Sequence, residues 1–238
     1  YKEIKFTHSI NIDIFKKNSF KNFSKNNYLI LGDSQSLDLF KIFSSSKTLS
    51  KSSEFVYFDD KFEINYISEN SNTALGYRTR LLNSEAFKYA DYIILSSDYS
   101  LKEINSIDKY VDFLKQFNKK IIVSSVFPQT TTDDPIMTLL LKYKNKKLTK
   151  EQKEKKLFKN LQINRIIKNN KIIYKKLKNK NVSIFDRTEL ICNFKYEKCD
   201  ALTLDNYFVY NDSRHITNEG AIYISNKRSI SQFFNNLN

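Results

Sequence analysis

Two short segments, far apart in the chain, carry side chains that could do nucleophilic chemistry. Residues 32–34 (Gly-Asp-Ser) follow the apolar run 28–31, and residues 212–215 (Asp-Ser-Arg-His) lie near the C-terminus. A serine hydroxyl, an imidazole base and a carboxylate that orients the base are the groups with which serine enzymes transfer or hydrolyse acyl groups. The chain has two histidines, and His8 lies in a polar N-terminal stretch, so His215 is the candidate base.

Each segment is ordinary when taken alone. Gly-Asp-Ser is frequent in turns, where glycine adopts a positive φ and Asp or Ser caps the following helix. A histidine such as His215 can simply pack at the start of a helix, and Thr217 and Asn218 are typical helix-start residues. The position of Ser34 favours a catalytic role, because it lies between an apolar strand candidate and the helical pattern of residues 37–43.

The apolar periodicity predicts strands and helices in alternation, which indicates parallel βαβ units with helices on both faces of one sheet. The expected fold is an α/β, three-layer α/β/α sandwich with a mainly parallel sheet. Ligands of such sheets bind at the carboxyl ends of the strands, where Ser34 lies if the first strand ends at Leu31. We expect strands at 28–31, 54–58, 92–95, 121–126 and 182–185, and helices at 37–43, 80–90, 104–117, 135–143, 151–177 and 217–234.

A chain of 238 residues, 40% of them hydrophobic, can bury one sizeable core. We expect an N-terminal arm or connector over residues 1–27 and one domain over 28–238, with a solvated lysine-rich insertion near 142–156. No run reaches the roughly 18 to 20 apolar residues of a membrane span. The first residue is tyrosine, so the chain can be a mature product or part of a longer protein.

The formal net charge of +14 fits contact with nucleic acid or with an anionic polysaccharide. The lysines are spread along the chain beside abundant Asn and Ile, with one dense stretch over 142–180. This bias is typical of compositional drift across a genome, so a nucleic-acid partner is not expected.

Cys192 and Cys199 are the two cysteines of the chain, and six residues separate them in a polar stretch. They are too few for a cysteine-only zinc site, and we expect neither a metal nor a cofactor. A local disulfide fits and would imply an oxidising compartment, while two unrelated reduced thiols remain the alternative.

The pairing of Gly-Asp-Ser at the first strand with Asp-x-x-His before the last helix resembles the SGNH (GDSL-like) hydrolase superfamily. The sequence is most similar to the SGNH domains of cell-envelope polysaccharide and peptidoglycan O-acetyltransferases, including those fused behind a membrane acyltransferase-3 domain. This finer likeness rests on the cysteine pair, on residues 210–217 and on Gly220-Ala221. The resemblance implies an SGNH-like, flavodoxin-like catalytic domain over 28–238 and a periplasmic or other extracytoplasmic location.

Carried to this chain, the resemblance makes Ser34 the nucleophile, His215 the general base and Asp212 the residue that orients the imidazole. An imidazole with an ordinary pKa of about 6.5 can take the proton of a serine hydroxyl near neutral pH. Asp33 is expected to be structural, turning the chain beside the nucleophile.

The oxyanion hole is where this sequence departs from the family pattern. The resemblance implies three donors, namely the backbone N–H of Ser34, a glycine after the second strand and an asparagine after the third. Gly76 is the candidate glycine, whereas residues 94–99 contain neither glycine nor asparagine. We expect Ser97, Asn72 or a backbone amide to substitute, because losing one donor costs about two to three orders of magnitude in rate.

Three functions compete. The resemblance implies transfer of an acyl group, acetyl in the first instance, from a donor to a hydroxyl of a cell-envelope glycan through an acyl-serine, with a membrane acyltransferase domain as the implied partner. Attack by water would make the same site a carbohydrate or acetyl esterase. A noncatalytic basic module that binds polysaccharide or nucleic acid fits the charge and the absent asparagine.

Overall fold

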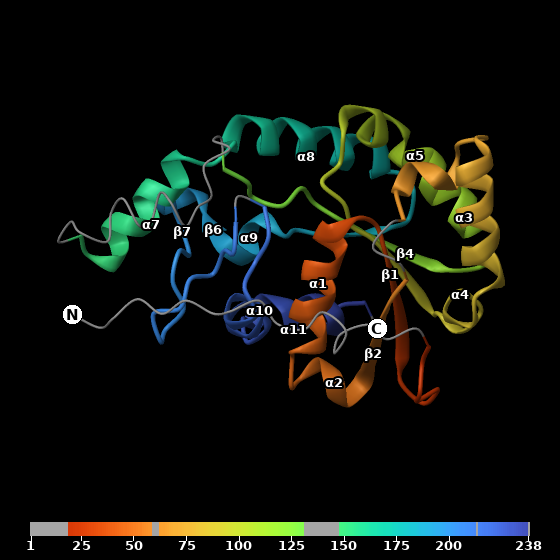
Figure 1. Ribbon diagram of the computed structural model, residues 1–238, viewed down its shortest axis with the longest axis horizontal. Helices are drawn as coiled ribbons and strands as arrows, with labels where there is room; N and C mark the ends of the chain where they lie inside the picture. Colours follow the sequence, from red (N-terminus) through yellow and green to blue (C-terminus); the bar gives the residue numbers. More distant parts are fainter. Residues whose placement is uncertain (1–18, 59–61, 131–147, 213, 238) are drawn as a thin grey trace.

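The centre of the fold is a five-stranded sheet in the order β2-β1-β3-β4-β5, with every neighbouring pair parallel (Figure 1). The computed structural model describes residues 19–58, 62–130, 148–212 and 214–237. The strands are β1 (Asn26–Leu31), β2 (Ser53–Tyr57), β3 (Tyr92–Leu95), β4 (Lys120–Ser124) and β5 (Ser183–Phe185). All five predicted strands are confirmed with small shifts at their ends, and the strand order is the flavodoxin-like one.

Helices cover both faces of this sheet. They are α1 (Ser34–Ser44), α2 (Leu49–Ser52), α3 (Asn72–Asn83), α4 (Glu85–Tyr89), α5 (Leu101–Lys115), α7 (Lys150–Lys159), α8 (Ile163–Leu177), α9 (Thr188–Ile191), α10 (Asn218–Ser225) and α11 (Arg228–Asn235), with 3-10 turns η2 (Ile64–Ile67) and η3 (Phe194–Tyr196). Side chains of β1 alternate between two cores: Tyr28 and Ile30 pack with α1, α10 and α11, while Leu29 and Leu31 pack with α5 and α8. The predicted three-layer α/β/α sandwich is confirmed.

Two of the long predicted helices are each divided in the structure. The pattern over 151–177 becomes α7 and α8, because the backbone N–H of Gln162 between them donates to the carbonyl of Gln129 at 2.9 Å and not to the preceding turn of α7. The pattern over 217–234 becomes α10 and α11, which meet at Lys227. Tertiary contacts at both breaks override a periodicity that would continue as one helix.

The expected arm and insertion fall partly outside the described residues, which exclude 1–18 and 131–147. The helix expected at 135–143 lies in the second of these ranges. The described end of the arm packs onto the fold through Phe20, which is buried. Within the described ranges, none of the helices has the length and apolar content that crossing a bilayer requires.

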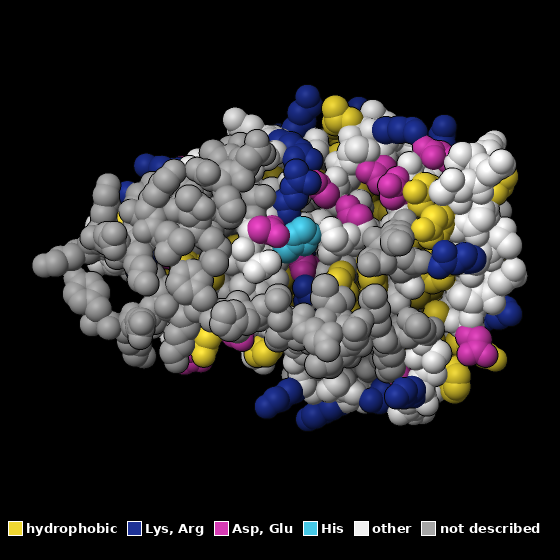
Figure 2. Space-filling model, in the orientation of Figure 1, with side chains coloured by type: hydrophobic (Ala, Val, Ile, Leu, Met, Phe, Trp, Pro, Cys, Tyr) yellow, Lys and Arg dark blue, Asp and Glu magenta, His cyan; other side chains and the backbone are white. Residues whose placement is uncertain are grey.

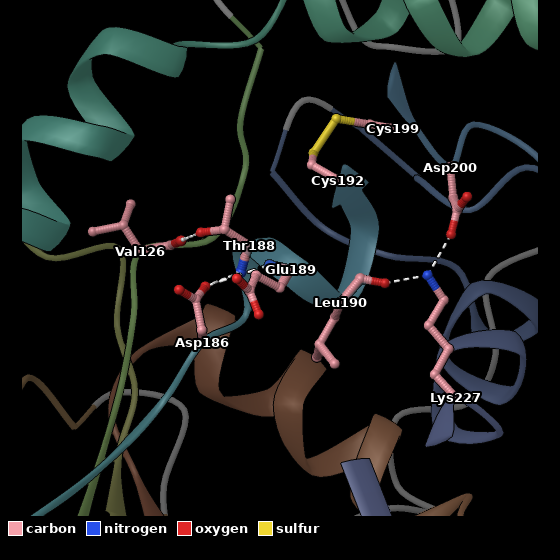
Figure 3. The surroundings of a disulfide bond; sticks show 9 residues. All are labelled: Val126, Asp186, Thr188, Glu189, Leu190, Cys192, Cys199, Asp200 and Lys227. Carbon is pink, nitrogen blue, oxygen red and sulfur yellow. Dashed lines mark hydrogen bonds and ion pairs between the residues drawn. A yellow bond between two sulfur atoms is a disulfide. The ribbon is translucent and has the colours of Figure 1, made fainter. Parts of the chain in front are cut away.

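A small antiparallel hairpin, β6 (Cys192–Asn193) and β7 (Lys198–Cys199), follows α9. Its two cysteines lie opposite each other in the register and form a disulfide (Figure 3). Beside the disulfide, Lys227 pairs with the carboxylate of Asp200 and donates to the carbonyl of Leu190. The disulfide therefore closes the hairpin, and Lys227, between α10 and α11, bonds to the residues on either side of it.

Reduction of this disulfide is expected to lower the free energy of unfolding by about 2 kcal/mol, because opening a short loop returns chain entropy to the unfolded state. Urea unfolding with and without a reductant measures the loss. The Cys192→Ala/Cys199→Ala double variant is the control, since the reductant should leave its stability unchanged. A comparable loss in that variant would show that the disulfide is not its source.

Candidate active site

Ser34 is the first residue of α1 and follows β1 through a tight turn at Gly32. Gly32 has φ +143°, and a Cβ there would lie 1.6 Å from the carbonyl oxygen of Ser96, so the turn requires glycine. Asp33 caps α1, its carboxylate accepting the backbone N–H of Gln35 at 2.9 Å. The serine thus lies at the carboxyl end of β1, the strand whose neighbours in the sheet are β2 and β3. The strand order reverses beside β1, and ligands of such sheets bind at that point.

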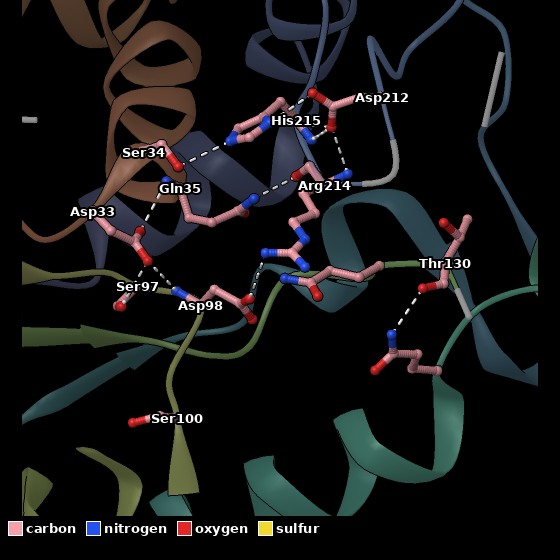
Figure 4. Close-up of polar contacts among 12 residues, drawn as sticks. Asp33, Ser34, Gln35, Ser97, Asp98, Ser100, Thr130, Asp212, Arg214 and His215 are labelled. Atoms are coloured by element: carbon pink, nitrogen blue, oxygen red, sulfur yellow. Dashed lines mark hydrogen bonds and ion pairs between the residues drawn. The ribbon is translucent and has the colours of Figure 1, made fainter. Parts of the chain in front are cut away.

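Asp33 also joins this turn to the loop that follows β3. Its second carboxylate oxygen accepts the hydroxyl of Ser97 and the backbone N–H of Asp98, each at 3.0 Å (Figure 4). The contacts of Asp33 are therefore structural, in agreement with the sequence interpretation.

His215 and Asp212 lie in the loop that leads into α10 and point toward Ser34 (Figure 4). The Nε2 atom of His215 is 2.9 Å from Ser34 Oγ, and its Nδ1 atom is 2.8 Å from Asp212 Oδ2. The Asp212 carboxylate also accepts the backbone N–H groups of Arg214 (2.7 Å) and His215 (2.8 Å). The three side chains form one continuous hydrogen-bonded chain, which is the arrangement that activates a serine hydroxyl for acyl chemistry.

Two buried polar residues of α1 hold the histidine loop in place. The side-chain amide of Gln35 donates to the carbonyl of Arg214 at 2.5 Å, and the carboxylate of Asp38 accepts the backbone N–H of Ile216 at 3.1 Å. The sequence analysis missed both residues. Their signal is spacing, because polar side chains one and four positions after Ser34 fall on a helix face that the apolar pattern would bury.

The carboxylate of Asp212 stays ionised across the pH range of ordinary assays. Burial raises its pKa, but hydrogen bonds from the His215 ring and from the backbone N–H groups of Arg214 and His215 lower it to about 2. The bond to Asp212 raises the pKa of His215; burial opposes that shift, and the charge of Asp38 adds to it. Both carboxylates favour the imidazolium that forms when the ring accepts a proton.

The value of kcat/KM for ester turnover is expected to rise with pH through a midpoint above the ordinary histidine pKa of 6.5. Only the neutral imidazole can accept the Ser34 proton, and Asp212 stabilises the protonated imidazolium, which cannot accept it. In Asp212→Asn the midpoint should move to lower pH, because an amide does not stabilise the imidazolium. pH–rate profiles of both proteins check this, and an unchanged or higher midpoint in the variant would contradict it.

Arg187 is a fully buried cation beneath the site, and sequence reasoning missed it. Its guanidinium donates to the carbonyls of Gln35 (3.1 Å), Ser97 (3.4 Å) and Ser125 (3.0 Å) and to the hydroxyl of Ser96 (2.9 Å). These acceptors follow β1, β3 and β4, so one side chain ties the start of α1 to two loops at the carboxyl edge of the sheet. A signal was present, since an arginine two residues after a predicted strand falls at that same edge.

The four candidate oxyanion donors differ in their location and in whether another group already occupies them. The backbone N–H of Ser34 lies in the first turn of α1, where the helix offers no carbonyl partner. Ser97 lies beside the site, but its hydroxyl bonds to Asp33. Gly76 and Asn72 belong to the exposed helix α3, so the expectation that Gly76 lies in a loop is wrong. The amide of Gly76 lies within the helical hydrogen-bond pattern and is not presented to a ligand.

Comparison with known proteins identifies the family. The model of the SGNH domain (fused to AT3 domains) matches residues 13–227, and no curated protein matches the chain. Among solved structures, the periplasmic domain of the lipopolysaccharide acetyltransferase of Salmonella ser. Paratyphi A is similar with a TM-score of 0.68 and 15% sequence identity, over 94% of this chain and 90% of that one. That likeness shows the shared fold. Because the family model covers most of the sequence, the chain belongs to the SGNH domain family, in the group described as fused to AT3 domains.

Proposed function

We propose that this domain transfers an acyl group, acetyl in the first instance, to a hydroxyl of a cell-envelope glycan through an acyl-serine intermediate. The observation that carries the proposal is the hydrogen-bonded chain from Ser34 through His215 to Asp212. Membership of the SGNH family supports acyl chemistry, and the structural neighbour is a lipopolysaccharide acetyltransferase domain.

In the proposed mechanism, His215 Nε2 takes the hydroxyl proton while Ser34 Oγ attacks the carbonyl carbon of the donor ester. The imidazolium then protonates the departing oxygen, which leaves an acyl-serine. A glycan hydroxyl attacks that ester and passes its proton to His215, and collapse of the intermediate returns the proton to Ser34 and releases the acylated glycan. The backbone N–H of Ser34 and the positive end of α1 stabilise the oxyanion of both steps.

The proposed setting is extracytoplasmic, with a membrane acyltransferase domain as the source of the acyl group. The disulfide between Cys192 and Cys199 supports an oxidising compartment. The structural neighbour is a periplasmic domain, and the family description names fusion to AT3 domains.

Hydrolysis is the second candidate function of the same site. The side chains of His215 and Asp212 are 30% and 41% exposed, so water can reach the place where the acyl-serine would form. An esterase would use the same first step and differ in the attacking hydroxyl.

Acetyl release from a chromogenic acetate ester, with and without added oligosaccharides, tests both functions, and mass spectrometry after an acid quench seeks acetyl on Ser34. Turnover that oligosaccharide accelerates, with acetylated sugar as product, would support transfer. Turnover that no oligosaccharide changes would favour the esterase. A folded protein with neither turnover nor acetyl-serine would contradict the proposal and favour a noncatalytic binding module.

A further inference from the structure

Two arginines from distant parts of the chain meet at one carboxylate beside the proposed nucleophile. Arg165 Nη2 lies 3.2 Å from Asp98 Oδ1, and Arg214 Nη1 lies 3.9 Å from Asp98 Oδ2. The side chain of Asp98 is 20% exposed, whereas those of Arg165 and Arg214 are 40% and 61% exposed. One inner carboxylate therefore faces two outer cations, which leaves a surplus positive charge at the surface.

Asp98 and Arg214 are both connected to the residues around Ser34 and His215. The backbone N–H of Asp98 donates to Asp33, which caps the helix that begins with Ser34. Arg214 directly precedes His215 and extends its side chain from the histidine loop toward Asp98 (Figure 4). On the surface, basic side chains lie above the histidine and acidic side chains lie on both sides of it (Figure 2). A ligand held by the two arginines would lie next to the reacting serine.

Arg165 also lines a cleft where α7 meets α8. The cleft has a volume of about 500 Å³, which is in the range of sites for small ligands. Phe158, Leu161 and Ile163 give it an apolar wall, and Asn164 adds a polar group. Among the described residues of its lining, the other charged ones are Lys159 and Glu197, and Arg165 is the one that also pairs with Asp98. Apolar walls with a few polar groups suit the faces and hydroxyls of a sugar ring.

We propose that this cleft and the arginine pair form a subsite for an acidic glycan, with one anionic group between Arg165 and Arg214 and an adjoining sugar in the cleft. A guanidinium presents paired N–H donors that match the two oxygens of a carboxylate or phosphate. The net charge of +14 adds long-range attraction for such a polymer. The inference rests on the proposed function in that it makes the acidic glycan the acyl acceptor.

Isothermal titration of the full chain carrying Ser34→Ala tests the subsite without any need for turnover. The probes are trigalacturonate with its fully methyl-esterified form, and a maltotriose phosphate with maltotriose. At least one acidic sugar should bind at least about tenfold more tightly than its neutral partner. The acidic sugar with the larger preference identifies the anion as carboxylate or phosphate.

Arg165→Gln/Arg214→Gln should abolish this preference, while the control Arg80→Gln/Arg228→Gln, with the same loss of charge in α3 and α11, should retain it. Circular dichroism checks the fold, and Arg214→Gln alone replaces the double variant if that variant unfolds. Equal binding of acidic and neutral sugars, or an equal loss in the control, would overturn the inference. Ester turnover without anion preference contradicts the subsite alone, whereas anion preference without turnover or acyl-serine contradicts the proposed chemistry.

Discussion

Ser34→Ala is expected to lower turnover of a chromogenic acetate ester by at least about three orders of magnitude. The hydroxyl is the attacking group of the proposed mechanism, and its contact at 2.9 Å with His215 is the contact through which the base acts. His215→Ala should cost about as much, because a nucleophile and its base work as one unit and removing either disables both. Purified proteins assayed for kcat/KM on the same ester provide the comparison.

Ser36→Ala is the matched control for that measurement. Ser36 lies two residues further along α1, is buried, and donates its hydroxyl to the backbone carbonyl of Asp33 at 2.6 Å, so it stands outside the catalytic chain. It should lose some stability and retain turnover within about tenfold of wild type. If Ser34→Ala kept full activity while Ser36→Ala lost it, the nucleophile would be misassigned.

Arg187→Met is expected to lower the free energy of unfolding by about 3 to 5 kcal/mol, because each buried carbonyl left without a donor costs about 1 to 3 kcal/mol. Methionine fills much of the space but donates no hydrogen bond. The carbonyls of Gln35, Ser97 and Ser125 would lose their contacts with the guanidinium, at positions where water has little access. The aromatic ring of Phe127, 5.2 Å from the guanidinium carbon, would lose its cation.

Urea unfolding of wild type and Arg187→Met measures this loss, and Arg228→Met serves as control because Arg228 is exposed at the start of α11. A surface change of that kind usually alters stability by no more than about 0.5 kcal/mol. Arg187→Lys should fall between wild type and methionine, since it keeps the charge without the forked donors. Equal stability of Arg187→Met and wild type would show that the buried cation does not hold the start of α1 and the two loops together.

The strands could be predicted because they are short apolar runs buried on both faces, a pattern that leaves few alternatives. The positions of Ser34, Asp212 and His215 could be predicted because each belongs to a short local motif at the end of an element. The structure brings these three side chains together, while their catalytic roles stay predictions.

The supports of the site could not be predicted, because they are contacts between elements and not patterns within one. Gln35, Asp38 and Arg187 are polar residues in buried places, and no periodicity indicates which distant backbone group each will meet. The error at Gly76 has a local cause. A glycine suggested a loop, but Ser71 caps the helix at the N–H of Ala74, and one glycine costs a helix only about 1 kcal/mol.

The two anchors from α1 to the histidine loop couple groups that are 181 positions apart in the chain. Ser34 and the loop that carries His215 are attached to the same short piece of helix, so a rigid displacement of α1 would move both and preserve the distance between the two side chains. In the proposed mechanism, the two hydrogen bonds from α1 therefore help to fix the distance between the proton donor and the proton acceptor.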